Sequence, residues 1–341
     1  MGIMMHNFLH WLGPMVKENE YQFINRNVFR YTNILKELPD DTLLQLISFF
    51  GHYGVPVFLF ISGYGLVLKY ENQNNVPANN GSLIPGGVRD AWTFIRQHFM
   101  KLFPMMMLGF CTFAMVDWMT PGRHHWAWQD IMAQITMTIN IFENPDRIIW
   151  PGPYWFFGLM MQLYIVYRLL LYRRHWAVTI AMIFVCWGIQ TLCDPDGETL
   201  NRVRYNFIGG MLPFGMGILL GHMERVRPVC LNKAALGLIF IISLTAVLTL
   251  SLFFEGWLWV PAFVVTLHLA LIKLLPAACL RPLNWIGALS SAIFVCHPIT
   301  RKIFIPISHG GNVMDGLVIY IVSSLMLAML FRVAVNKIKN N

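Results

Sequence analysis

Residues 51–70 read GHYGVPVFLFISGYGLVLKY and are apolar over almost their whole length. A helix needs about 20 apolar residues to cross the hydrocarbon core of a bilayer. Similar runs recur along the chain, and nine in all are predicted to span, at 47–68, 99–116, 154–172, 176–193, 205–222, 234–254, 257–275, 285–305 and 315–336. The pattern predicts an all-α, polytopic membrane protein that forms a single domain over residues 1–341.

The composition supports the same class. The chain is 56% hydrophobic and 12% charged, where a soluble domain carries roughly 25% charged residues. Its mean hydropathy is +0.54. The net charge of +8 is that of basic cytoplasmic loops rather than of a nucleic-acid-binding protein. The six cysteines form no CxxC pair, so they indicate neither a zinc site nor a disulfide framework.

Two segments between the runs have a different character. Residues 129–142 are short and threonine-rich, which predicts an interfacial segment rather than a span. The asparagine-rich residues 71–87, ENQNNVPANNGSLIPGG, are typical of a flexible loop. No soluble domain of any size is inserted.

Loop charge predicts the orientation. When the nine runs alternate in direction and the C-terminus is cytoplasmic, the cytoplasmic side holds 15 of the 25 Lys and Arg residues. The positive-inside rule favours this arrangement. The loop 14–46 then lies on the opposite side of a bacterial inner membrane.

The first 14 residues, MGIMMHNFLHWLGP, form an apolar run that is too short to span. They lack the basic region and the cleavage site of a signal peptide. Because the loop 14–46 must be entered from the membrane, we expect these residues to be the outer half of a first helix, which makes about ten transmembrane helices. The alternative is a half-helix tucked under the bundle.

His6 and His10 are four residues apart and share one face of that helix. Ionisable residues within membrane segments mark function by default, and a histidine can act as a general base near neutral pH. A histidine bonded to a backbone carbonyl is the structural alternative. No HExxH pattern and no nearby carboxylate cluster accompany the pair, so we predict no metal site.

The run at 47–68, with VPVFLFISGYGL at residues 55–66, resembles the second helix of the membrane acyltransferase family 3. That family has ten helices and a histidine in the first. Residues 94–104, FIRQHFMKLFP, are similar to its entry to the third helix. Residues 154–167, YWFFGLMMQLYIVY, and 283–298, LNWIGALSSAIFVCHP, are similar to two later helices. The resemblance covers essentially the whole chain.

Two departures accompany the resemblance. Many family members carry Arg or Lys eleven positions before the first-helix histidine, and counting back from His6 passes the start of this chain. We therefore expect low or no activity from a chain that starts at Met1. Many members also have a Glu-Glu pair where Met160 and Met161 stand here, so an acid-base role of that pair cannot be carried over.

The resemblance implies an O-acyltransferase. An acyl group, acetyl by default, would pass from cytoplasmic acyl-coenzyme A to a hydroxyl of an envelope sugar or glycan precursor. His6 is the expected general base, with His10 second, and Arg96 and Lys101 are expected to bind the coenzyme A phosphates. The residues expected to contact the substrate are Ser62, Tyr64, Gln162, Tyr164 and His297.

Two other readings stay open. A transporter or flippase for a lipid-linked sugar would need broken helices at the membrane midplane. One span is interrupted by Gly209, Gly210, Pro213, Gly215 and Gly217, but no matching span occurs in the other half. The third reading is a catalytically disabled family relative. Trp126, Trp128, Trp150 and Trp155 are predicted to form an outer aromatic belt.

Overall fold

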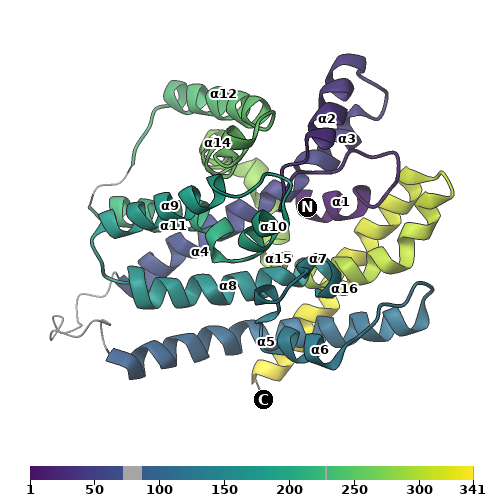
Figure 1. Ribbon diagram of the computed structural model, residues 1–341, viewed down its shortest axis with the longest axis horizontal. Helices are drawn as coiled ribbons and strands as arrows, with labels where there is room; N and C mark the ends of the chain where they lie inside the picture. Colours follow the sequence, from purple (N-terminus) through teal and green to yellow (C-terminus); the bar gives the residue numbers. More distant parts are fainter. Residues whose placement is uncertain (72–86, 227–228, 341) are drawn as a thin grey trace.

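The computed structural model describes residues 1–71, 87–226 and 229–340, and within these ranges it contains helices and loops but no strand (Figure 1). The predicted flexible loop lies almost wholly outside the described residues. The elements are α1 (Gly2–Leu9), α2 (Asn25–Glu37), α3 (Thr42–Phe50), η1 (Gly51–Tyr53), α4 (Gly54–Leu66), η2 (Val67–Glu71), α5 (Gly87–Met119), α6 (Trp128–Ile135), η3 (Ile139–Ile141), α7 (Pro145–Ile148), η4 (Gly152–Tyr154), α8 (Trp155–Val166), η5 (Tyr167–Leu171), α9 (Trp176–Thr191), α10 (Glu198–Tyr205), α11 (Phe207–Val226), α12 (Lys233–Leu250), α13 (Phe254–Trp257), α14 (Val260–Leu274), α15 (Ala277–His309) and α16 (Val313–Asn340).

Long apolar helices confirm the prediction of an all-α, multi-pass membrane protein. Among the described residues, six helical segments are long and apolar enough to span: Thr42–Glu71, Gly87–Met119, Gly152–Leu171, Lys233–Leu250, Ala277–His309 and Val313–Lys337. The helices Trp176–Thr191 and Val260–Leu274 are apolar but shorter. Each of the nine predicted runs falls on one of these helices or on α11, in which glycines, Pro213 and a charged end lower the hydropathy.

The third span begins twelve residues earlier than hydropathy predicts, at Gly87 rather than at residue 99. Ala91, Phe94 and His98 are buried at spacings of three and four residues, although Arg96 and other polar residues lie between them. A hydropathy average counts the polar residues, whereas the helix depends on the apolar face that it buries.

The helices α4 and α11 pack closely side by side because glycines face the partner backbone. A Cβ added at Gly63 would collide with the carbonyl oxygen of Phe214, and one at Gly217 would collide with that of Phe60. Small residues allow such close approach of membrane helices. The glycine of the ISGYG sequence is thus required by the packing of α4 on α11.

The short helix α1 packs against α3, η1 and α15 near the middle of the molecule (Figure 1). A Cβ at Gly51 would lie 2.5 Å from the Cβ of His6 and 2.8 Å from the carbonyl oxygen of Gly2. The glycine before α4 therefore allows the His6 face of α1 to lie directly against the start of the second span.

The segment 129–142 forms the short helices α6 and η3 rather than a span, as predicted from its length. Its last part is not surface-bound, since Asn140 is fully buried. The Asn140 amide donates hydrogen bonds to the carbonyl oxygens of Trp155 (2.8 Å) and Tyr205 (2.7 Å). It thereby fixes two residues that line the candidate site.

Candidate active site

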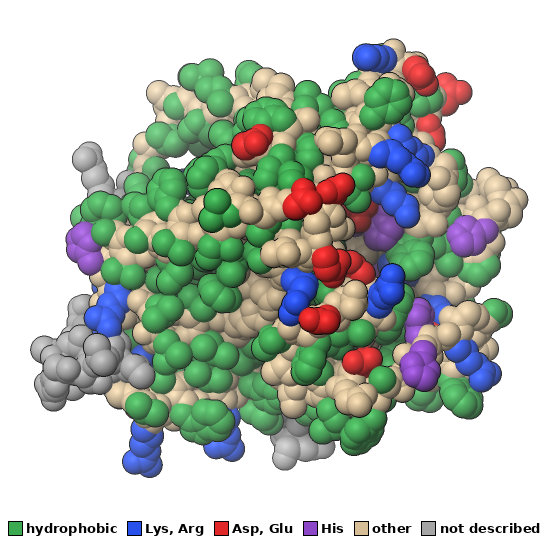
Figure 2. All heavy atoms as spheres, viewed as in Figure 1, with side chains coloured by type: hydrophobic (Ala, Val, Ile, Leu, Met, Phe, Trp, Pro, Cys, Tyr) green, Lys and Arg blue, Asp and Glu red, His purple; other side chains and the backbone are tan. Residues whose placement is uncertain are grey.

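A polar cavity of about 260 Å³, here called the His6 cavity, lies where α1, the loop after it, α7, α10 and α15 converge. Its wall is formed by Ile3, His6, Asn7, His10, Trp11, Glu18, Glu20, Tyr21, His52, Val55, Pro145, Asp146, Ile149, Trp150, Gly152, Pro153, Trp155, Tyr205, Phe294 and Arg301. Figure 2 shows that charged and histidine side chains gather on one part of a mostly apolar face. This concentration of polar groups in an apolar bundle makes the cavity the strongest site candidate.

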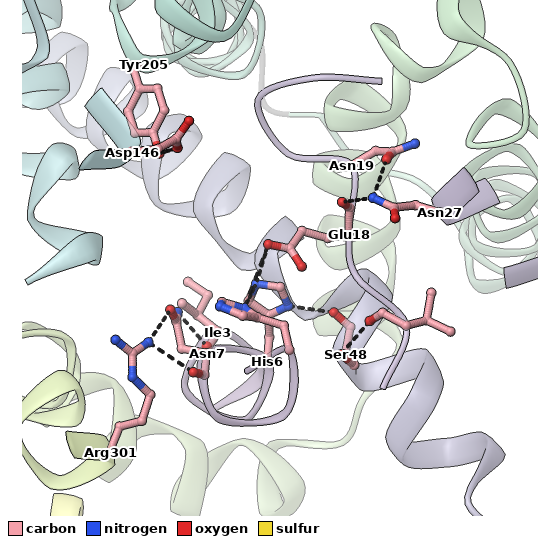
Figure 3. A network of polar contacts seen from close by, with 12 residues as sticks. Ile3, His6, Asn7, Glu18, Asn19, Asn27, Ser48, Asp146, Tyr205 and Arg301 are labelled. Atoms are coloured by element: carbon pink, nitrogen blue, oxygen red, sulfur yellow. Dashed lines mark hydrogen bonds and ion pairs between the residues drawn. The ribbon is translucent and has the colours of Figure 1, made fainter. Parts of the chain in front are cut away.

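His6 is held in one orientation by the backbone. Its side chain is buried, and its Nδ1 lies 2.6 Å from the carbonyl oxygen of Ser48 (Figure 3). Because a carbonyl oxygen only accepts, Nδ1 carries the proton in this hydrogen bond. The other nitrogen, Nε2, is then the acceptor of the neutral ring.

His10 and Glu18 face that acceptor nitrogen. Nδ1 of His10 lies 3.2 Å from Nε2 of His6, and Oε1 of Glu18 lies 3.7 Å from both nitrogens. The second carboxylate oxygen of Glu18 is buried and has no hydrogen-bond partner among the described residues.

His6, His10 and Glu18 also offer the donor atoms of a metal site, because one ligand atom from each lies within 4.8 Å of the others. Two histidines and a carboxylate are a ligand set that Zn²⁺ accepts. No carboxylate cluster accompanies the pair in the sequence, whereas the fold brings Glu18 to it. The predicted absence of a metal stays a prediction.

The loop that carries Glu18 is fixed at several points. The amide of Asn27 donates to the carbonyl oxygen of Glu18 at 2.8 Å, and the indole of Trp257 donates to that of Asn19 at 2.9 Å. The guanidinium of Arg204 donates to the carbonyl oxygen of Glu20 at 2.7 Å. These contacts hold an irregular segment in place, so that the carboxylate of Glu18 is presented to the histidines in a defined geometry.

Burial and the neighbouring carboxylate of Glu18 raise the pKa of Glu20 from its ordinary value of 4.5 to about 8. The first cause is desolvation of the charged form and the second is like-charge repulsion. Near neutral pH, Glu20 is therefore largely protonated and can donate a hydrogen bond into the cavity.

His52, in η1, also lines the His6 cavity. It is buried, and its ring centroid lies 5.5 Å from that of His6. Neither of its ring nitrogens has a hydrogen-bond partner among the described residues. Buried polar groups are nearly always paired, so these nitrogens are available to water or to a ligand in the cavity.

Aromatic rings form the adjoining wall. Tyr21 stacks on Tyr205, with ring centroids 3.8 Å apart, and Trp155 packs edge-on against both. The hydroxyl of Tyr205 donates to Asp146 at 2.5 Å (Figure 3). Trp155 and Trp150 line this cavity, whereas the sequence analysis assigned them to an outer aromatic belt.

Arg301 of α15 enters the cavity from the side opposite Glu18, as Figure 3 shows. Its Nη1 donates to the carbonyl oxygen of Asn7 at 3.1 Å. His297, one helical turn earlier, is buried and donates from Nδ1 to the carbonyl oxygen of Ile293 at 3.1 Å. His297 is not part of the cavity wall, and its contact with an acceptor stays a prediction.

The predicted donor-binding residues lie at the other end of α4. A groove of about 300 Å³, here called the Lys101 groove, is lined by Ile61, Ser62, Gly65, Leu66, Lys69, Tyr70, Gln97, His98, Lys101 and Tyr164. It brings together Ser62, Lys101 and Tyr164, which the sequence analysis had named separately. Arg96 is exposed on the same helix and does not line the groove.

Two predicted substrate-contacting residues have structural partners instead. The hydroxyl of Tyr64 donates to Glu224 at 2.5 Å. The amide of Gln162 donates to Asn206 at 2.7 Å and accepts from the backbone N–H of Phe207 at 2.9 Å. Gln162 thus links α8 to the junction between α10 and α11. Neither side chain lines the His6 cavity or the Lys101 groove, and their roles toward substrate stay predictions.

Sequence reasoning missed Glu18, Glu20, His52, Asp146 and Arg301. The loop residues carry no motif, and their approach to α1 depends on tertiary contacts. Arg301 did leave a signal, because it is an ionisable residue within an apolar run and follows His297 at helical spacing.

Comparison with known protein families identifies the family of this chain. No curated protein matches the chain, and no solved structure matches it either. A family model described as an acyltransferase domain matches residues 1–333. The chain therefore belongs to the acyltransferase 3 family and is a membrane acyltransferase.

Proposed function

We propose that the protein is an O-acyltransferase that moves an acyl group, with acetyl as the first candidate, from acyl-coenzyme A to a hydroxyl group of an envelope sugar or glycan precursor. The observation that carries the proposal is His6. Its Nδ1 is tied to the Ser48 carbonyl, so that the basic Nε2 faces a polar cavity beside Glu18.

The chemistry follows from that arrangement. His6 Nε2 takes the proton of the acceptor hydroxyl as its oxygen attacks the thioester carbonyl carbon, and a new C–O bond forms. The carbonyl electron pair moves onto its oxygen. When the pair returns, the C–S bond breaks, and the coenzyme A sulfur leaves and recovers the proton from His6. Glu18 stabilises the imidazolium between these two steps.

His10 takes a supporting role. Its Nδ1 lies within hydrogen-bond distance of the basic nitrogen of His6, while its own ring is less buried. It can relay a proton between the cavity and His6. For this reason His6 is the primary base and His10 the secondary one.

The acceptor would occupy the His6 cavity. The stacked Tyr21 and Tyr205, together with Trp155, offer flat apolar surface, and Asp146 and the unpaired nitrogens of His52 offer hydrogen-bond partners. Aromatic faces flanked by polar groups suit a sugar ring, which has apolar faces and a polar rim. This is the reason for preferring a carbohydrate hydroxyl over a lipid alcohol.

The donor would approach from the Lys101 groove. Lys69 and Lys101 line it, and Arg96 is exposed nearby, so cations are available for the coenzyme A phosphates. Val55 of the His6 cavity and Ser62 of the groove lie seven residues apart on α4, which is about 10 Å at 1.5 Å per residue. The acyl-bearing end of acyl-coenzyme A would extend across this distance, from the groove to the cavity.

The proposed location is a bacterial inner membrane with the C-terminus in the cytoplasm. The Lys101 groove then faces the cytoplasm, where acyl-coenzyme A is made, and the His6 cavity faces the envelope. The argument is the excess of Lys and Arg on the groove side. A reporter fused after Asn341 should be active in the cytoplasm only.

The transporter and the disabled-relative alternatives are less well supported. A disabled enzyme has no need for a buried histidine that is oriented by a backbone carbonyl and faced by a carboxylate. A transporter has no need for it either, unless the histidine titrates during transport. Release of coenzyme A thiol is the observation that separates these readings from an acyltransferase.

The test is an acyl-transfer assay with the purified protein in proteoliposomes. Acetyl- and succinyl-coenzyme A are supplied with neutral oligosaccharide acceptors, and thiol release is followed together with the mass of the acceptor. We expect acceptor-dependent thiol release that is lost in His6→Ala. Equal thiol release by His6→Ala and the parent would refute the assignment of the base. Parent thiol release that does not depend on the acceptor would refute the proposed function.

A further inference from the structure

Arg301 is a buried cation without a carboxylate partner. Its side chain lies in the wall of the His6 cavity and is 7% exposed. Within the described residues no carboxylate oxygen lies within 4 Å of it, whereas the neighbouring Lys302 is paired with Asp117 at 2.7 Å. A buried charge without a counterion is costly, so the position calls for a negative charge that arrives with the substrate.

The acidic residues of the cavity are already engaged. Glu18 faces the two histidines, and Asp146 accepts hydrogen bonds from Tyr205 and from Asn201 at 2.7 Å. Glu20 is largely protonated near neutral pH because its pKa is raised to about 8. None of these groups neutralises the guanidinium, and Arg301 is the one Lys or Arg in the wall of the His6 cavity.

The guanidinium is fixed to the same helical turn as the base. Its Nη1 donates to the carbonyl oxygen of Asn7 at 3.1 Å and lies 3.5 Å from the Asn7 side-chain oxygen (Figure 3). It also lies over the ring of Trp11, 5.0 Å from the centroid. Because Asn7 follows His6 directly, the cation and the base are held in a fixed relation by α1.

We propose that Arg301 stabilises the oxyanion that forms on the acyl carbonyl oxygen when the acceptor hydroxyl attacks the thioester. The inference rests on the proposed acyl transfer and names the residue that bears its negative charge. The charge is absent in the ground state and full in the tetrahedral intermediate, so a preorganised cation lowers the barrier rather than tightening substrate binding.

The same cation would also suit a phosphate or carboxylate on the acceptor. That alternative differs in kinetics, because an anionic group of the acceptor is present before the reaction. Its loss would raise the acceptor KM and leave kcat intact. The oxyanion role lowers kcat with both KM values nearly unchanged.

The experiment compares Arg301→Ala and Arg301→Lys with Arg202→Ala as the matched control. Arg202 lies outside the cavity wall, where it pairs with the exposed Glu143. Folding is checked by detergent-stable size-exclusion profiles and by equal membrane abundance. We expect kcat of Arg301→Ala to fall about 10²–10³-fold, kcat of Arg301→Lys to fall less, and Arg202→Ala to match the parent.

Chemical rescue separates catalysis from structure. Added guanidinium ion should raise the kcat of Arg301→Ala at least tenfold, and urea at the same concentration should not. If the alanine variant does not fold, Arg301→Lys and Arg301→Gln decide, because the lysine retains the charge and should be at least tenfold faster.

Three results would overturn the inference. The first is a kcat of Arg301→Ala within threefold of the parent, and the second is a loss confined to the acceptor KM. The third is equal kcat for the lysine and glutamine variants. When the parent shows acceptor-dependent thiol release, any of these results refutes the role of Arg301 alone. Parent thiol release that does not depend on the acceptor refutes the proposed function and this inference with it.

Discussion

The two ends of α4 differ in how their polar groups are held. At the His6 cavity, polar side chains are buried, and His6, Glu18 and Arg301 are fixed by backbone carbonyls or by a pinned loop. At the Lys101 groove, the cations Lys69 and Lys101 are exposed. Rigid, desolvated groups suit bond-making steps, and exposed, solvated cations suit binding of a charged ligand at modest energetic cost. This difference is the reason for proposing the chemical step at one end and donor binding at the other.

The largest expected effect is at the buried end. His6→Ala should lower kcat by about 10²–10⁴-fold because no other cavity group replaces a positioned general base. The donor KM should stay within threefold of the parent, since the Lys101 groove is untouched. Initial rates of thiol release at varied donor concentration measure both values.

His268→Ala is the matched control, because His268 also bonds a backbone carbonyl, that of Val264, but lies outside the cavity. The kcat of His10→Ala should lie between those of His6→Ala and His268→Ala. A rise in donor KM for His6→Ala that equals its loss in kcat would show that the two ends are not separate.

The second prediction concerns the exposed end. Neutralising Arg96 and Lys101 together should raise the donor KM about tenfold, equivalent to about 1.4 kcal/mol, with kcat changed less than threefold. Surface charges contribute modestly and are screened by salt, so the difference from the parent should shrink at high ionic strength. Acyl-coenzyme A titration at two salt concentrations checks this.

Arg332→Ala serves as the control for insertion, because Arg332 on α16 is exposed and does not line the groove. Unchanged donor KM in the double variant, at normal membrane abundance, would leave Arg96 and Lys101 as topology anchors only.

Glu18→Gln is expected to have a smaller effect than His6→Ala within the same cavity. The amide keeps the shape but removes the charge that stabilises the imidazolium, so kcat should fall about tenfold. Asp146→Asn changes a carboxylate that faces Tyr205 rather than the histidines, and should retain kcat within about threefold. A reversal of this order would assign the charge partner of the base to Asp146.

The pH dependence of stability gives a further test of the buried end. The folded pKa of Glu20, about 8, exceeds its ordinary value of 4.5, so the folded state binds more protons between these pH values. Stability should therefore fall as pH rises from 4.5 to 8 and should change little from this group outside the window. Glu20→Gln should flatten the slope of the apparent melting temperature in detergent over that range.

The smallest expected effect is that of a chelator. Since we predict no metal at His6, His10 and Glu18, incubation with EDTA followed by its removal should change kcat by less than twofold. A large loss of kcat that is restored by Zn²⁺ would show that the three side chains bind a metal ion. It would contradict the assignment of His6 as the general base.

The sequence by itself determined the class of the protein and most of its helices. Apolar runs such as residues 51–70 are long enough to span, and their length reports membrane crossing without knowledge of any partner. The close packing at the glycine of ISGYG is expected from its residue type alone. His6 is likewise a candidate base from the sequence alone. The family resemblance was also carried by local motifs, and the match over residues 1–333 confirms it.

Only the tertiary structure decided which groups meet His6. Glu18 comes from an irregular loop, His52 from the start of the second span, and Arg301 from a helix almost 300 residues later. No periodicity links these positions, because each is brought in by packing between elements rather than by helical spacing. The contacts of Gln162 are also tertiary, since its side chain joins α8 to Asn206 and Phe207, where α10 ends and α11 begins. Helices follow from local patterns of burial, whereas a site follows from long-range contacts that a one-dimensional pattern does not contain.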